Sequence, residues 1–198
     1  TVYYAFDAMG KAVIHGGVFG GKSVGSDKMT TGEGTTWSSD IMGNVTKGSI
    51  QQNFGLITIN TTMPGGKVVT NVMAKMFSQN TKTYSVSQNP PAGVTEDYNQ
   101  PGSGLDGSKS SQDMTVYYAY NAKGQMVDGK ATSGNDVAVF GGKETSSGRI
   151  TVGEGTSWNS DEFGGQTKST IRQDYKVYNG QAKMTSQTTK TFSVNAAG

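Results

Sequence analysis

Residues 171–181 read Ile-Arg-Gln-Asp-Tyr-Lys-Val-Tyr-Asn-Gly-Gln. Ile171, Tyr175 and Val177 fall on one face at a spacing of two, and charged residues alternate with them, which is typical of a strand with one covered face. Asn179-Gly180 follows directly, and this dipeptide accepts the positive φ angles of a type I′ turn. The stretch therefore predicts a β-strand that runs into a tight hairpin.

The same strand pattern occurs earlier in the chain, because most of the sequence is present twice. Four motifs recur in the same order: 1–6 with 115–120, 18–22 with 139–143, 32–40 with 153–161, and 81–86 with 189–194. Turn signals about every ten residues favour a small all-β unit. We therefore predict an all-β fold with two tandem copies of a small antiparallel β-sandwich or barrel unit. Whether each copy closes alone or both share one barrel is open at this stage.

The segment between the copies is rich in Pro, Gly and Ser, which marks turns and linkers. We assign residues 1–87 to the first repeat (copy one), 88–113 to a linker, and 114–198 to the second repeat (copy two). Copy two is longer before Val139, and copy one is longer around the hairpin Met63–Lys67. Insertions within paired strands would slip the register, so we expect these loops to hold the differences between the copies. The apolar residues that flank Met63–Lys67 predict that this hairpin packs on copy two or on another molecule.

Composition excludes several classes of function. The net charge of the 198 residues is only +2, and the two arginines, Arg149 and Arg172, are too few for a nucleic-acid surface. No apolar stretch has membrane-spanning length, so we expect no membrane insertion. The chain has no Cys, and His15 is its one histidine, so we predict no disulfide, no metal site and no cofactor.

The most informative motif is Gly-Glu-Gly-Thr-x-Trp-x-Ser-Asp, at 32–40 and again at 153–161. As a strand, neither of its faces is apolar. A Trp ring among hydroxyl and carboxylate groups suits a sugar, because the ring stacks on C–H groups while polar side chains bond the hydroxyls. The predicted ligand-binding residues are Glu33, Trp37, Asp40, Glu154, Trp158, Asn159 and Asp161. The alternative is that each Trp plugs the end of its own core, since Trp is usually well buried.

The carboxylates of this motif do not predict catalysis. Glu33 and Asp40 lie seven residues apart, as do Glu154 and Asp161, and an extended segment of that length spans roughly 23 Å. Glycosidase carboxylates need to be much closer together. We therefore predict no enzyme.

Two functions remain at this stage. The first is a non-catalytic, lectin-like or adhesive protein that binds carbohydrate, with one site in each copy for avidity. The alternative is a self-assembling structural subunit of an extracellular filament or surface layer, in which strands pair between copies of the chain. Both place the protein outside the cell or on its surface. A signal peptide removed before Thr1 fits that location, whereas loss of an initiator Met fits an untargeted cytoplasmic product.

Overall fold

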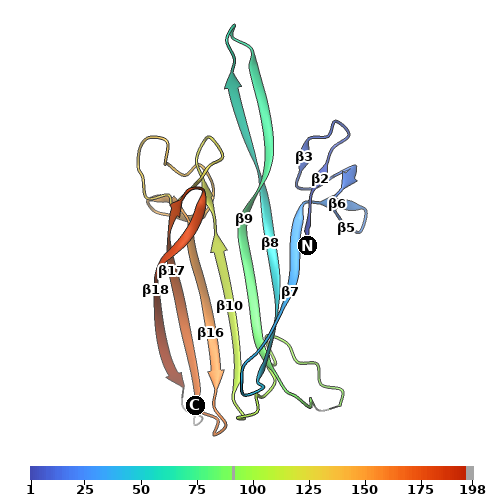
Figure 1. The fold of residues 1–198 in the computed structure, drawn as a ribbon, viewed down its shortest axis with the longest axis vertical. Helices are drawn as coiled ribbons and strands as arrows, with labels where there is room; N and C mark the ends of the chain where they lie inside the picture. Colours follow the sequence, from blue (N-terminus) through green and yellow to red (C-terminus); the bar gives the residue numbers. More distant parts are fainter. Residues whose placement is uncertain (91, 195–198) are drawn as a thin grey trace.

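The computed structural model describes residues 1–90 and 92–194, and these residues form strands and loops without any helix (Figure 1). The strands of copy one are β1 (Val2–Tyr3), β2 (Ala5–Phe6), β3 (Ala12–Val13), β4 (Phe19–Gly20), β5 (Lys22–Val24), β6 (Asp27–Met29), β7 (Thr31–Ser39), β8 (Val45–Thr62) and β9 (Val68–Val86). The strands that follow are β10 (Lys109–Tyr117), β11 (Ala119–Tyr120), β12 (Met126–Val127), β13 (Phe140–Gly141), β14 (Lys143–Thr145), β15 (Gly148–Ile150), β16 (Val152–Ser160), β17 (Gln166–Tyr178) and β18 (Gln181–Val194). The prediction of an all-β chain is confirmed.

One large antiparallel sheet runs through both copies. Its strand order is β1-β7-β8-β9-β10-β16-β17-β18, with four strands on each side of the β9–β10 contact. The sheet is open, and β1 and β18 lie at its two edges. We expected a sandwich or barrel unit in each copy, and no closed barrel forms. The reason is that the last strand of copy one pairs with β10, so the copies join edge to edge instead of each closing on itself.

Each copy also folds small sheets at the same end of the large one: β2-β3-β4 and β5-β6 in copy one, and β11-β12-β13 and β14-β15 in copy two. A threonine holds each small sheet in place. The buried Thr30 accepts a hydrogen bond from the N–H of Ala5 (2.9 Å) and donates one to the carbonyl of Val13 (2.6 Å). Thr151 does the same in copy two, between Ala119 and Val127, at the same two distances.

Strand pairing follows the sequence repeat residue by residue. Val2 lies opposite Gly32 in copy one, and Val116 lies opposite Gly153 at the equivalent place. A β-bulge interrupts the β8–β9 ladder between Asn53 and Phe54. The β17–β18 ladder shifts between Asp174 and Tyr175, which are the residues equivalent to Asn53 and Phe54. The common bulge means that both hairpins bend at the same position.

The hairpin predicted around Asn179-Gly180 forms. Tyr178 pairs with Gln181, which leaves a two-residue turn. Asn179 has a φ of 49° and Gly180 a φ of 75°, the two positive angles that a type I′ turn requires.

The longer hairpin of copy one, β8–β9, projects beyond the rest of the sheet (Figure 1). Its base packs on copy two. Ile57 is fully buried. The side chains of Ile59 and Met73 lie so close to Gly124 that a methyl group there would come within 3.1 Å of each. Its tip is exposed, so the predicted contact with copy two involves only the lower part of the hairpin.

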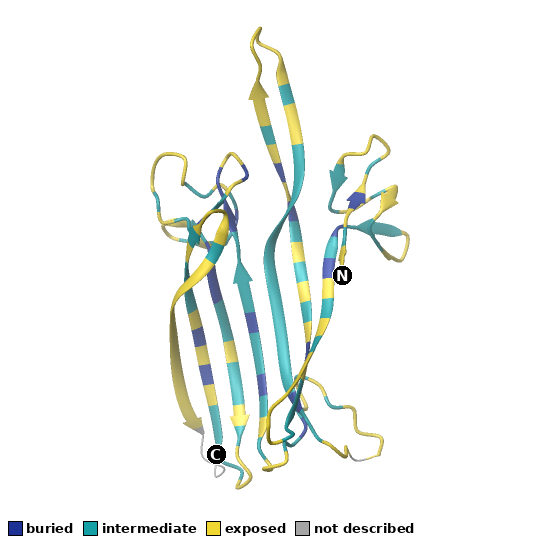
Figure 2. Cartoon of the chain, in the orientation of Figure 1, coloured by how far each residue is buried: buried dark blue, intermediate teal, exposed yellow. Residues whose placement is uncertain are grey.

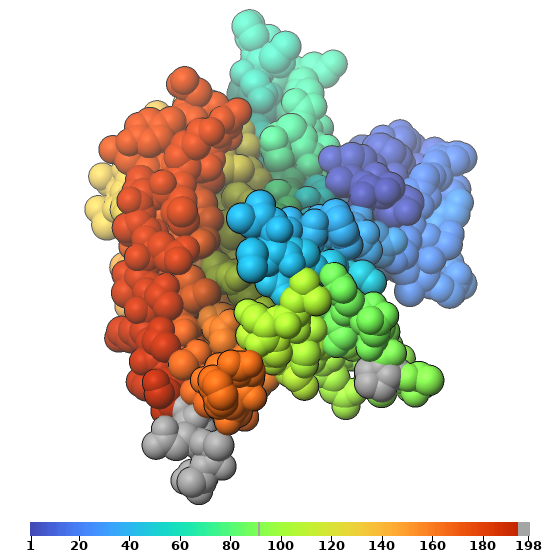
Figure 3. Space-filling view, turned by 60° about the horizontal axis from the view of Figure 1, so that its bottom comes forward, coloured from blue at the N-terminus to red at the C-terminus, as the bar shows by residue number. Residues whose placement is uncertain are grey.

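The linker lies against the end of the sheet that comes forward in Figure 3, where it is coloured green. Gly102 donates its N–H to the carbonyl of Ser85 (2.8 Å), and the Ser85 hydroxyl donates to the carbonyl of Gly102 (2.6 Å). Leu105 donates its N–H to the side-chain oxygen of Asn44 (2.7 Å). Strand β10 begins at Lys109, inside the segment that the sequence assigned to the linker.

The contact between β9 and β10 joins the two copies. Seven residue pairs lie in register, from Ser111 opposite Tyr84 to Tyr117 opposite Ser78. The bulge leaves Phe77 opposite no residue of β8, and its ring lies 6.0 Å from the ring of Tyr120. The hydroxyl of the buried Tyr120 donates to the carbonyl of Met76 (2.8 Å).

The buried apolar residues gather at this joint and in copy two (Figure 2). They are Ala5, Ile57, Met114, Ala119, Tyr120, Val127, Val152 and Ile171. Copy one contributes only Ala5 and Ile57 to this set, and Ile57 lies in the hairpin that packs on copy two. The joint is therefore a principal part of the core.

Replacing Tyr120 with Phe tests the joint. At neutral pH we expect a loss of about 1 kcal/mol in the free energy of unfolding, because the Met76 carbonyl loses its donor. Burial raises the pKa of Tyr120 from 10 to about 12. A raised pKa means that this residue stabilises the fold below pH 10, and that the contribution is lost as the pH rises through 12.

The measurement is urea denaturation of wild type and Tyr120→Phe between pH 8 and pH 12, a range that includes the interval from pH 10 to about 12 over which linkage acts. The variant should lose less stability than wild type over that range. The matched control is Tyr178→Phe, at an exposed tyrosine. Equal slopes for wild type and Tyr120→Phe would contradict the assignment.

Candidate functional site: sheet edges and tryptophan strands

The two tryptophan motifs form equivalent strands, β7 and β16, although neither face of the motif is apolar. Glu33 is the third residue of β7, and Asp40 follows its last residue. The structure therefore does not bring Glu33 and Asp40 together, and the same holds for Glu154 and Asp161 around β16.

The glutamates of the motif are engaged in ion pairs within their own copies. Lys22 donates to the carboxylate of Glu33, and Lys143 donates to that of Glu154. Glu154 has a second cation nearby, since the guanidinium of Arg172 lies 3.5 Å from its carboxylate. Such pairing accounts for both carboxylates without a ligand.

The aspartates of the motif close turns. Asp40 accepts the N–H groups of Met42 and Asn44, both at 2.9 Å. The side-chain amide of Asn44 also donates to Asp40, and it is the main cause of a lowered pKa at that exposed carboxyl. Asp161 accepts the N–H groups of Phe163 (3.0 Å) and Gly165 (2.7 Å) in the same way. Both residues stabilise the turn that follows their strand.

The two tryptophans differ in environment. Trp37 is 65% exposed, whereas Trp158 is half-buried and donates its indole N–H to Gln166 (3.2 Å). Trp158 also lines a cavity of about 410 Å³ together with Glu96, Asn99 and Lys109. Asn159 is exposed and lines a neighbouring cavity of about 390 Å³ with Asp161. The motif thus has a cavity beside it in copy two.

The difference in exposure between Trp37 and Trp158 matches a difference in the strands beside them. In copy two, β10 covers the edge of β16 along its whole length, with Ser111 opposite Trp158. In copy one, β1 covers only the start of β7, with Tyr3 opposite Thr31 and Val2 opposite Gly32. From Gly34 to Ser39 the outer edge of β7 has no strand partner among the described residues. Trp37 is therefore exposed beside an open edge.

The opposite edge of the sheet is β18, which pairs with β17 on one side only. Its residues 182–194 repeat residues 74–86 of β9 and differ only at 185, 188 and 192. The outer edge of β18 thus has nearly the same sequence as the edge of β9 that pairs with β10. In the part of the chain described, no strand lies beside that edge of β18. Sequence reasoning could have found this edge, because the repeat already identifies β18 as the equivalent of β9.

The aromatic residues at the other edge are exposed in copy one and covered in copy two. Tyr4, Phe6 and Phe19 are 48%, 37% and 55% exposed. Their equivalents are Tyr118, Tyr120 and Phe140, which are half-buried, 5% exposed and half-buried. The covered set lies beside β9, so the exposed set marks the place where a strand like β9 would pack. We call Tyr4, Phe6 and Phe19 the aromatic cluster.

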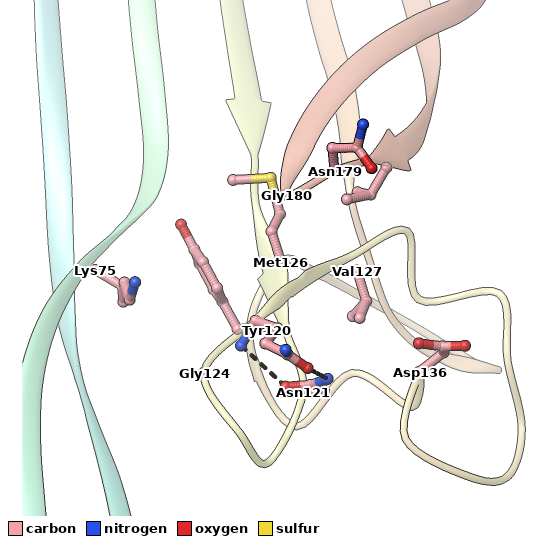
Figure 4. Close-up of a pocket in the computed structure, with 11 residues that line it drawn as sticks. Lys75, Tyr120, Asn121, Gly124, Met126, Val127, Asp136, Asn179 and Gly180 are labelled. Atoms are coloured by element: carbon pink, nitrogen blue, oxygen red, sulfur yellow. Dashed lines mark hydrogen bonds between the residues drawn. The ribbon is translucent and has the colours of Figure 1, made fainter.

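A further cavity, of about 540 Å³, lies where β9 meets copy two (Figure 4). Lys75 borders it from β9, Tyr120 and Met126 border it from the small sheet of copy two, and Gly180 borders it from the type I′ turn. Asn121 lies at its wall, where its side chain bonds Lys123, Gln125 and Asn135 of its own loop. These bonds give Asn121 a structural role.

The described residues bring no three His, Asp or Glu side chains together in a way that could hold a metal ion. Nor do residues 1–90 and 92–194 include a helix that could span a bilayer. Comparison of the chain with protein-family models, with curated proteins and with solved structures found no match in any of the three.

The unequal tryptophans can be separated by fluorescence. In the Trp158→Phe protein only Trp37 emits, and we expect red-shifted emission that iodide quenches strongly, because the ring faces water. In the Trp37→Phe protein only Trp158 emits, and we expect a bluer spectrum and weaker quenching. Identical quenching of the two proteins would show that β10 does not shield the second tryptophan.

Proposed function

We propose that the protein is a structural subunit that assembles head to tail by continuing its sheet from one molecule to the next. In this assembly β18 of one molecule lies beside β1 of the next, as β9 lies beside β10 within the chain. The observation that carries the proposal is that the chain already contains one such joint between equivalent units.

The backbone of the two edges supports this pairing. The carbonyl of Phe77 accepts the N–H of Tyr118 (2.9 Å). The backbone N–H and C=O groups of Phe77, and of every second residue of β9 after it, therefore point toward β10. The equivalent residues of β18 are Gln187, Thr189 and Thr191. At the other edge, Thr1 and Glu33 exchange backbone hydrogen bonds, which leaves the N–H and C=O of Val2 directed outward. By the register of the internal joint, Val2 would pair with Gln187.

The aromatic cluster supports the same arrangement. Exposed apolar groups that gather on one surface often mark an interface. In copy two the Tyr120 side chain contacts β9, at the ring of Phe77 and the carbonyl of Met76, and in an assembly Phe6 would face β18 in the same way. The new joint would be weaker than the internal one, because Thr185 stands where β9 has Phe77 and the hairpin of copy two is short.

The symmetry of the contact determines the kind of assembly. The two edges are different surfaces, so the interface is head to tail and yields a ring or an open filament. Strand β18 contains no proline, and proline is one of the usual features that stop edge strands from pairing. An extracellular filament or surface layer is the setting that we propose.

The test is a proline at Gln187. The backbone N–H of Gln187 faces outward, so Gln187→Pro removes one donor of the intermolecular ladder and keeps the hydrogen bonds between β17 and β18. We expect wild type to form larger species as its concentration rises, and Gln187→Pro to dissociate at least about tenfold more readily, a change of about 1.4 kcal/mol. Analytical ultracentrifugation measures both.

The matched control is Gln187→Val, which keeps the N–H and suits a strand. It should assemble like wild type. On the opposite edge, Phe19→Ser should weaken assembly as well, because it removes part of the aromatic cluster. A wild-type protein that stays monomeric at every concentration up to the solubility limit would overturn the proposal.

We propose carbohydrate binding as a second candidate, with no catalysis. The cavity beside Trp158 supports it, because the indole borders a space lined by Glu96, Asn99 and Gln100, side chains that bond hydroxyl groups. In copy one the cavity beside the motif, of about 810 Å³, is lined by Glu33, Gly34 and Thr35 and not by Trp37, whose exposed ring offers a stacking surface by itself. The second site would therefore bind a sugar more tightly than the first.

A glycan array tests this candidate with wild type, Trp158→Ala and Trp37→Ala. We expect retention of a glycan by wild type and a larger loss with Trp158→Ala than with Trp37→Ala. An array on which wild type retains nothing would remove carbohydrate binding from consideration.

A further inference from the structure

We infer that the open edge of β7, from Gly34 to Ser39, is a binding site for an extended strand with the sequence pattern of Lys109–Met114. The strand would lie antiparallel to β7. The inference rests on the proposed function in one respect: both use copy two as the template for an outer edge of copy one.

The template is the pairing of Lys109–Met114 with β16. Each of these six residues lies opposite one residue of β16, from Lys109 opposite Ser160 to Met114 opposite Gly155. The equivalent residues of β7 are Gly34 to Ser39. The two edges have nearly the same sequence, Gly-Thr-Thr-Trp-Ser-Ser and Gly-Thr-Ser-Trp-Asn-Ser. An occupant that suits one edge therefore suits the other.

The backbone of β7 determines which groups of the occupant take part. Glu33 exchanges hydrogen bonds with Thr1, so Thr35, Trp37 and Ser39 also direct their N–H and C=O groups toward the open edge. In the bound strand, the residues equivalent to Ser111 and Asp113 would bond these groups. The residue equivalent to Gln112 would face away from β7.

Side chains add a preference for small polar residues and one carboxylate. In the template, Ser111 is buried. Asp113 accepts from the side chain of Asn80 and lies 3.5 Å from Lys82. In a head-to-tail assembly, Lys190 of β18 is equivalent to Lys82 and would face the same carboxylate. The β7 edge itself thus accepts a Ser-rich strand, and the carboxylate would gain a cation only where Lys190 of a neighbouring molecule lies beside it.

The exposure of Trp37 provides the readout. Trp158 is half-buried where a strand covers its edge, and Trp37 is 65% exposed where none does. A strand bound along β7 would therefore shield Trp37. The probe is the peptide Gly-Ser-Lys-Ser-Ser-Gln-Asp-Met-Thr, which copies residues 107–115, blocked at both ends and added to the Trp158→Phe protein.

We expect a saturable blue shift of Trp37 emission, and iodide quenching that falls toward the value of Trp158 in the Trp37→Phe protein. A peptide with Pro in place of the residue equivalent to Ser111 loses a donor to β7 and should bind at least about tenfold more weakly. The control peptide has Pro in place of the residue equivalent to Gln112, whose N–H faces away, and it should still bind.

A protein variant gives the complementary test. Thr35→Pro in the Trp158→Phe background removes an outward N–H of β7 and should abolish the shift, and Thr35→Val should keep it. An unchanged Trp37 spectrum up to millimolar peptide would overturn the inference. So would equal binding of the two proline peptides, because that would show contact with side chains instead of pairing with the edge.

The inference and the proposed assembly can fail separately. Assembly is measured without peptide and depends on Gln187, whereas peptide binding is measured at concentrations where the protein is monomeric and depends on Thr35. Peptide binding by a protein that never assembles would leave the strand site intact and remove the filament.

Discussion

The pairing of β9 with β10 is the interaction on which the rest of the structure depends. It turns two four-stranded units into one sheet, and it places Phe77 against Tyr120 at the point where the small sheet of copy two meets copy one. The joint covers the aromatic side of copy two with β9, and this explains why most of the buried apolar residues lie at the joint or in copy two.

The sequence was sufficient to predict an all-β chain, the turn at Asn179-Gly180 and the places where the copies differ in length. Alternation and turn chemistry are local, so a single sequence carries them. The open sheet could not be predicted, because the choice between closure and edge-to-edge pairing depends on which strands meet. The start of β10 is a case in point. Lys109–Asp113 lies in a polar stretch that resembles a linker, and it becomes a strand because it has an edge on either side.

The tryptophan motif shows the limit of a motif read without its neighbours. Its nine residues are almost the same in both copies, yet Trp37 faces water and Trp158 is shielded. The glutamates and aspartates that suggested a ligand site have partners in their own copy: lysines for the glutamates and turn N–H groups for the aspartates. What the pattern could not specify was the surroundings: in copy two, strand β10 pairs with the edge beside Trp158, and the linker residues Glu96 and Asn99 border the same cavity as its ring.

The long hairpin β8–β9 occurs once in each molecule and projects past the end of the other strands. Strands in a sheet are spaced by roughly 4.8 Å, so eight of them advance the sheet by about 38 Å. Each step also twists by about 20–25°, so eight strands turn the sheet through nearly half a revolution. In a ribbon built from whole molecules, the β8–β9 hairpins would thus lie in two rows on nearly opposite sides. Each row would contain the hairpin of every second molecule, with a period of about 77 Å. Such a ribbon would have unlike ends, and growth at one would differ from growth at the other.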